Sequence, residues 1–229
     1  MSIRLLTLLV AVLSAAALEG QAPAPAPLPP DINPVTLSRL PPVTRGDLDA
    51  EGQKLFDARP PATPGPGPGH VSRYSPRTAE GQGLIGRGLG VPSGEGFPLG
   101  VRTYQLVVLI TAREIDQQYE WSAHEPAGLR AGLEQSVIDI VKYDRPVENV
   151  AGLADKDATL IRFFRALFRE HKVSSDLWAK MVEHFGRQRT VEMMALMADY
   201  FTVGMMMNAV DQHLPPQRQP LLPPLTRGR

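Results

Sequence analysis

The chain has 229 residues, and its 24 Lys and Arg residues equal its 24 Asp and Glu residues. A neutral chain has no field of one sign to attract nucleic acid or an anionic membrane surface, so nucleic-acid binding is not expected. Cysteine is absent, which excludes a disulfide framework, a thiolate nucleophile and a thiolate metal ligand. The length suits one domain with a sizeable core.

The first residues have the pattern of a secretory signal. Arg4 precedes an apolar run from Leu5 to Leu18, and small residues follow that run. The run is shorter than the roughly 20 residues that a membrane-spanning helix requires. We therefore predict a signal peptide over residues 1–22, cleaved after Ala22 or, as second choice, after Ala17. The mature protein would be secreted or periplasmic and free of the membrane; an uncleaved anchor is the alternative.

Proline and glycine divide the rest of the chain. Residues 23–36 alternate Ala and Pro, which predicts an extended linker. Residues 37–212 form the predicted domain, and residues 213–229 form a Pro-rich, extended tail. Residues 60–100 are so rich in Gly and Pro that we expect a long ordered loop there. The "GQGLIG" in this loop matches the dinucleotide fingerprint by letter, but no buried strand precedes it, so a Rossmann site is not expected.

Helical patterns account for the remaining segments. A first helix is expected over residues 44–59, where Thr44 or Asp47 can cap it. Residues 101–125 lack Gly and Pro and contain the apolar run "LVVLI", which favours a buried helix, with a buried strand as the alternative for the first half. Further helices are predicted over residues 133–143, from a cap at Asp155, from Ser174 or Ser175 to Gly186, and over residues 190–210.

The last of these helices is rich in methionine. At helical spacing, methionines are more often adaptable core residues than a promiscuous binding surface, so we assign them to the core. Gly204 in the same helix would let another helix approach closely. No strand pattern survives, and the predicted fold class is an all-α helical bundle.

The segment "QQYEWSAHE", residues 117–125, places polar side chains in otherwise apolar surroundings. Gln117, Glu120 and His124 are spaced three and four apart, so on one helix they form a polar stripe about two turns long, with Trp121 among them. A Glu–His pair at this spacing can simply stabilise a helix by a few tenths of a kcal/mol. The other histidines are scattered along the sequence, so the pair lacks a third ligand and no metal is expected.

The segment "TAREIDQQYEWSAHEPAGLRAGLEQSVIDIV" resembles the core of the carboxymuconolactone decarboxylase family, which also includes the alkylhydroperoxidase-D-like peroxidases. The resemblance extends over residues 37–212 and is carried by Arg113-Glu114, Glu120-Trp121, His124 and Gly132. It implies an all-helical subunit that assembles into trimers or hexamers, with a small pocket beside the central helix and no cofactor.

The two branches of this family differ in the chemistry that they imply. In the peroxidase branch the central helix carries Cys-x-x-Cys-x-x-x-His, and on this sequence the cysteine positions fall on Gln117 and Glu120 and the histidine on His124. Because both thiols are missing, residue type excludes peroxide reduction by the dithiol route. The decarboxylase branch resembles the sequence better, since its chemistry needs no thiol.

Decarboxylation of a carboxymuconolactone leaves an enolate-like anion that must be stabilised and then protonated at carbon. Histidine supplies a proton near neutral pH, so we predict His124 as the acid, with Glu120 either setting its tautomer and charge or serving as the acid itself. Gln117 and Arg113 are predicted to bind a substrate oxygen or carboxylate, and Trp121 to form an apolar wall.

The resulting hypothesis is a cofactor-independent, lyase-like protein that acts on a small carboxylated lactone or cyclic acid. Two alternatives stay open. One is a non-catalytic periplasmic binding or scaffold protein on the same fold, and the other, less favoured, is an antioxidant role as in the peroxidase branch.

Overall fold

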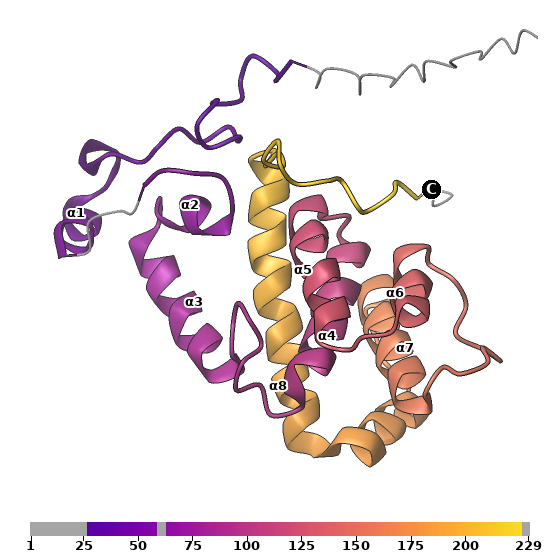
Figure 1. Cartoon of the computed structure of the whole chain (residues 1–229). Coiled ribbons are helices and arrows are strands. Elements are labelled where there is room, and N and C mark those ends of the chain that lie inside the picture. The colour runs from indigo at the N-terminus through magenta and orange to yellow at the C-terminus, as the bar shows by residue number, and fades with distance from the viewer. Residues whose placement is uncertain (1–26, 59–62, 226–229) are drawn as a thin grey trace, which may run out of the picture.

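The computed structural model describes residues 27–58 and 63–225; the predicted signal peptide and the start of the predicted linker lie outside the described residues. Throughout the described residues the regular elements are helices, as predicted (Figure 1). They are a short 3-10 turn at Arg45–Asp47, α1 at Ala50–Ala58, α2 at Pro68–Ser72, α3 at Pro76–Leu89, α4 at Gly100–Glu114, α5 at Gln118–Arg130, α6 at Gln135–Lys142, α7 at Asp155–Glu170 and α8 at Ser175–Ala209.

Helix α4 is the centre of the bundle. It packs against α5, α6, α7 and α8, and every residue from Tyr104 to Arg113 is buried. A helix enclosed on all sides needs apolar residues all round, which explains the "LVVLI" run. The prediction of a buried helix here is therefore confirmed, and the strand alternative is wrong.

The single helix expected over residues 101–125 is wrong, because the chain breaks between α4 and α5. Asp116 has a left-handed backbone with φ of 53°, and Gln117 caps α5 by accepting a hydrogen bond from the Tyr119 N–H at 2.6 Å. A Cβ on Gly204 would collide with Ile115 and contact Gln117, so α8 approaches closely at the break, as expected for Gly204. Gln117 thus stands at the turn rather than on the helical stripe.

The long loop expected over residues 60–100 is also wrong, since α2 and α3 occupy much of it. Helix α3 begins with a Ser75 cap, whose hydroxyl accepts from the Thr78 N–H, and Pro76 follows at the first helical position. It ends at Gly90, which has a left-handed backbone. Good caps at both ends offset part of the cost of the internal glycines, which is about 1 kcal/mol each. The "GQGLIG" segment lies inside this helix, away from any strand-to-helix turn.

The later helices lie close to their predicted positions. Helix α7 begins at Asp155, although Ala154 and not Asp155 is the capping residue. Ser174 caps α8 through a hydrogen bond from the Leu177 N–H at 3.2 Å. Gly186 has φ of 73° and kinks α8, so the two helices predicted on either side of it follow each other without a loop.

The tail predicted as a separate segment is part of the bundle surface. After α8 the chain runs without a helix back across the top of α5 (Figure 1), and Leu222 is buried in the main core. None of the helices among the described residues combines the length and the apolarity that a membrane crossing requires.

Candidate functional site

His124 lies at the middle of α5 and is held between two polar side chains. Its Nε2 is 3.3 Å from Glu120 Oε2, one turn earlier on α5, and its Nδ1 is 2.8 Å from Gln105 Oε1 on α4. All three residues are buried. The structure therefore brings the predicted pair, Glu120 and His124, together, and adds a third residue that the sequence analysis did not single out.

The Gln105 amide determines which histidine nitrogen exchanges its proton. Its Nε2 donates to the Ser93 carbonyl at 3.4 Å, so its Oε1 is left to accept from the His124 Nδ1–H. Nδ1 then stays protonated, and Nε2, facing Glu120, is the atom that gains or loses a proton. Such a ring can donate a proton as the cation and take one back as the neutral base.

Two tyrosines, Tyr104 on α4 and Tyr200 on α8, lie next to His124. The Tyr104 and Tyr200 hydroxyl groups are 2.6 Å apart, and the Tyr200 ring meets the His124 ring edge-on, with centroids 5.2 Å apart. Burial raises the pKa of both tyrosines well above the ordinary value, and the nearby carboxylates act in the same direction. Both hydroxyl groups therefore stay protonated at any physiological pH.

A second carboxyl group, Asp199, lies near Glu120. Asp199 is buried at the position before Tyr200, and burial together with the charge of Glu120 raises its pKa above the ordinary value. Within the described residues no donor forms a hydrogen bond with its carboxyl group. Sequence spacing could not have found Tyr104, Asp199 or Tyr200 as site residues, because they come from helices about a hundred residues apart.

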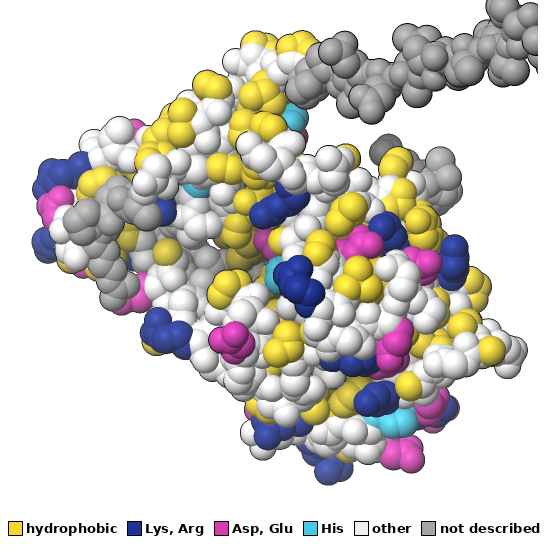
Figure 2. Space-filling model, in the orientation of Figure 1, with side chains coloured by type: hydrophobic (Ala, Val, Ile, Leu, Met, Phe, Trp, Pro, Cys, Tyr) yellow, Lys and Arg dark blue, Asp and Glu magenta, His cyan; other side chains and the backbone are white. Residues whose placement is uncertain are grey.

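His124 and Gln105 open onto a surface depression of about 610 Å³ between α5 and the loop that follows α3. In the space-filling view the surface is hollowed between the arm that contains α3 and the helical bundle (Figure 2). The depression is lined by Pro92, Ser93, Glu95, Val101, Gln105, Ala123, His124, Ala127, Arg130 and Ala131. It is large enough for a small cyclic molecule.

Trp121 does not line this depression, contrary to the prediction of an apolar pocket wall. It is fully buried in the main core, and its indole N–H donates to Glu125 Oε2 at 2.5 Å. Lys142 Nζ lies 2.9 Å from Glu125 Oε1 and completes a buried, charge-balanced contact between α5 and α6. Trp121 therefore stabilises the bundle on the side of α5 that faces away from the depression.

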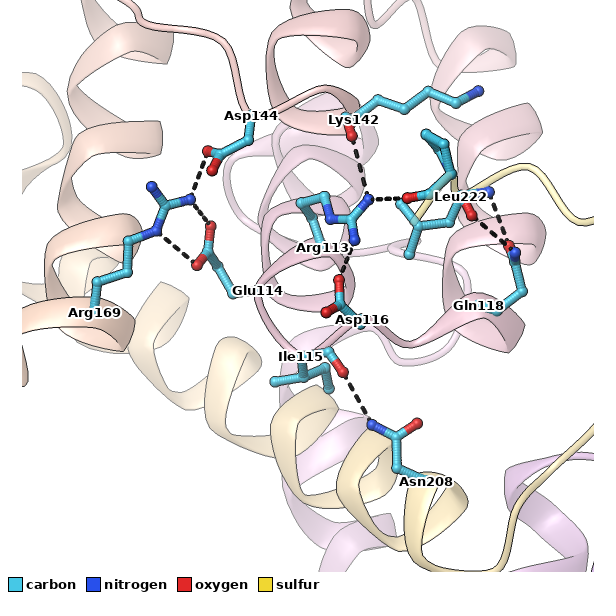
Figure 3. A network of polar contacts seen from close by, with 11 residues as sticks. Arg113, Glu114, Ile115, Asp116, Gln118, Lys142, Asp144, Arg169, Asn208 and Leu222 are labelled. Carbon is cyan, nitrogen blue, oxygen red and sulfur yellow. Dashed lines mark hydrogen bonds and ion pairs between the residues drawn. The ribbon is translucent and has the colours of Figure 1, made fainter. Parts of the chain in front are cut away.

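Gln117 and Arg113 do not line the depression either. The Gln117 amide donates to Asn208 Oδ1 at 2.8 Å and to the Gly204 carbonyl at 3.3 Å, tying α5 to α8. The Arg113 guanidinium is buried, pairs with Asp116, and donates to the carbonyl groups of Lys142 and Pro223 (Figure 3). The Gln117 amide and the Arg113 guanidinium therefore bind other parts of the protein and do not face a substrate in the depression.

Comparison with known proteins identifies the fold. No protein-family model matches the sequence, and no curated protein matches it. One solved structure is similar, an uncharacterized peroxidase-related protein from Ralstonia eutropha JMP134 described as an alkylhydroperoxidase AhpD core. The TM-score is 0.57 at 16% sequence identity, over 79% of this chain and 93% of that one. The chain has the AhpD-like fold.

The described part of this AhpD-like bundle does not gather metal-ligating side chains at one place. Among residues 27–58 and 63–225, no three His, Asp or Glu side chains gather closely enough to hold a metal ion. The residues that line the depression can supply proton transfer by His124, hydrogen bonding by Gln105, and charge pairing by Glu95 and Arg130 at its mouth.

Proposed function

We propose that the chain is a cysteine-free relative of the carboxymuconolactone decarboxylase family that performs acid–base chemistry on a small carboxylated lactone or cyclic acid. The observation that carries the proposal is the position of His124, held by Gln105 and Glu120 and opening onto a depression of about 610 Å³. A positioned base and acid with a solvent-accessible cavity is the minimum that such a reaction requires.

The proposed reaction is a decarboxylation that ends in proton transfer to carbon. The bond between the ring carbon and the carboxylate breaks, CO2 leaves, and the electron pair stays on the substrate as an enolate-like anion. The protonated His124 then gives its Nε2 proton to a carbon that shares this delocalised electron pair, and solvent returns a proton to the imidazole ring. Glu120 lies 3.3 Å from Nε2 and orients this nitrogen, while Gln105 keeps Nδ1 protonated throughout.

The absence of cysteine favours the decarboxylase branch of the resemblance over the peroxidase branch. Dithiol peroxide reduction needs two thiols, and the sequence has none. Glu120, at one of the positions that the resemblance assigns to cysteine, is instead paired with His124. This supports proton chemistry over redox chemistry for the same pocket.

Export and self-assembly belong to the same proposal. The N-terminal Arg4 and the apolar run after it support export to the periplasm or the medium. On α3, Leu84 and Ile85 are 62% and 49% exposed, which supports burial of this helix between subunits of a homo-oligomer.

The test measures CO2 release and ligand-induced melting shifts for a panel of small lactone acids and cyclic acids. A ligand at a hundred times its dissociation constant adds about 2.7 kcal/mol to the free energy of unfolding. We expect His124→Gln to lose turnover by about a hundredfold or more, and His184→Gln, a histidine of α8 paired with Asp155, to keep it. Unchanged turnover in His124→Gln would contradict the proposal, and binding without turnover in the wild type would favour the non-catalytic binding protein.

A further inference from the structure

Arg130 is a cation at the mouth of the depression whose side chain meets no partner in the part of the chain that the structure describes. It lies at the last residue of α5, is exposed, and lines the depression together with His124. Its guanidinium forms neither a hydrogen bond nor an ion pair with any described residue. By contrast, Arg102 pairs with Asp157 and Glu134, and Arg169 pairs with Glu114 and Asp144.

The stretch of α5 between His124 and Arg130 has room for a small ligand. Six residues at 1.5 Å each separate the two positions by about 9 Å along the helix axis. The lining residues on this face are Ala123, Ala127 and Ala131, whose side chains leave the helix surface open. An acid with a conjugated ring that lies over these alanines can place its carboxylate at Arg130 and, on the far side of the ring, a carbon that shares the electron pair left by CO2 toward His124.

Glu95 limits how much negative charge the same site accepts. It lies on the loop that follows α3, is exposed, and lines the depression opposite α5. The mouth therefore carries one cation and one anion. A ligand with one carboxylate can pair with Arg130, whereas a second carboxylate would be placed near Glu95 and repelled.

We infer that the site takes a small cyclic monocarboxylate, with Arg130 as the residue that binds its carboxylate and Glu95 as the residue that discriminates against dicarboxylates. This inference rests on the proposed function, because it assigns the substrate class of the same pocket. Arg130 takes the carboxylate-binding role that the sequence predicts for Arg113, because the Arg113 guanidinium is occupied by Asp116 and by backbone carbonyl groups.

The expected effects are those of partly solvated charges. A guanidinium–carboxylate pair at an open mouth is screened by water and salt, so we expect Arg130→Gln to weaken binding about five- to tenfold at low salt. The effect should shrink as ionic strength rises. Arg130→Lys keeps the charge but loses the two-pronged geometry, so its loss should be smaller.

The experiment is calorimetric titration of the purified protein with three probes of one ring size: cyclopentanecarboxylate, cyclopentane-1,2-dicarboxylate and neutral cyclopentanecarboxamide. We expect the monocarboxylate to bind most tightly to the wild type. Arg130→Gln should remove its advantage over the amide, and Glu95→Gln should improve dicarboxylate binding about two- to fivefold. Arg187→Gln removes an exposed arginine that does not line the depression, and it should change none of these affinities.

The outcomes separate this inference from the proposed reaction. Unchanged monocarboxylate affinity in Arg130→Gln, or equal losses in Arg130→Gln and Arg187→Gln, would overturn the inference, as would a wild type that binds none of the acids. If the monocarboxylate binds through Arg130 but no acid of the panel is turned over, the inference stands and the proposed decarboxylation fails. If turnover depends on His124 but not on Arg130, the proposed decarboxylation stands and the inference about Arg130 fails.

Discussion

The side-chain amide of Gln118 binds the backbone of Leu222 through both of its polar atoms. Its Nε2 donates to the Leu222 carbonyl at 3.0 Å, and its Oε1 accepts from the Leu222 N–H at 2.8 Å (Figure 3). Arg113 binds the following carbonyl, of Pro223, at 2.8 Å. These contacts hold the extended tail against the start of α5, two residues before Glu120.

Removal of the two hydrogen bonds between Gln118 and Leu222 should destabilise the fold. Gln118→Ala leaves the Leu222 N–H and carbonyl without these partners, and two hydrogen bonds contribute roughly 1–3 kcal/mol together. We expect a lower midpoint in urea unfolding. Gln188→Ala, which removes an exposed glutamine bonded to Glu192, should stay within about 0.5 kcal/mol of the wild type. Equal midpoints for the two variants would show that the Gln118–Leu222 hydrogen bonds add nothing to stability.

Two glycine-to-alanine changes should act in opposite directions. A Cβ at Gly204 would collide with the Cδ1 end of Ile115 at the break between α4 and α5 and force this side chain to move, so Gly204→Ala should cost about 1 kcal/mol through overpacking. Gly88 in α3 has open space around the Cβ position, so Gly88→Ala should gain about 0.5–1 kcal/mol of helix propensity. Thermal melting of both variants checks the pair. A stabilised Gly204→Ala would mean that α8 does not need this close approach.

The same break shows where sequence reasoning fails for the fold. The burial of α4 could be predicted, because an apolar surface on all sides of a helix has no other place to go. The break after Glu114 could not, because it depends on the left-handed backbone of Asp116 and on the approach of Gly204. Neither condition leaves a local pattern in residues 101–125.

Helix α3 was missed for a different reason. Its glycine content predicted a loop, but the signals for a helix were present at its ends: Ser75 and Pro76 at the start and Gly90 after the last residue. The capping residues decide the outcome here, although the helix propensity of the internal glycines is low. Tertiary packing against α1 and α8 supplies the remaining stabilisation.

The candidate site was predictable only in its local part. Glu120 and His124 meet because residues four apart on a helix are neighbours, which the sequence alone establishes once the helix is recognised. Trp121 is only three residues from His124, yet the boundary between the buried and open faces of α5 runs between them. Gln105 and Arg130 reach the depression through tertiary structure, so spacing could not select them.

Asp199 provides a pH-dependent test of the buried cluster. Burial and the charge of Glu120 raise the pKa of Asp199 above its ordinary value of 3.8, so the folded state holds this proton more tightly than the unfolded chain does. Between the unfolded and folded pKa values the folded protein binds more protons, and stability therefore falls as pH rises through that window. The penalty is absent below about pH 3.8 and complete above the folded pKa.

Asp199→Asn should remove this penalty while keeping the shape of the side chain. We expect the variant to be more stable than the wild type at pH 7, with the difference shrinking as pH falls toward 3.8. Urea unfolding of both proteins at several pH values between 3.5 and 8 measures the difference directly. Asp176→Asn, an exposed position in the first turn of α8, should show no gain at pH 7, because a carboxylate there favours the helix. A constant difference between Asp199→Asn and the wild type at all pH values would mean that the carboxyl group carries no ionisation penalty and that Glu120 does not act on it.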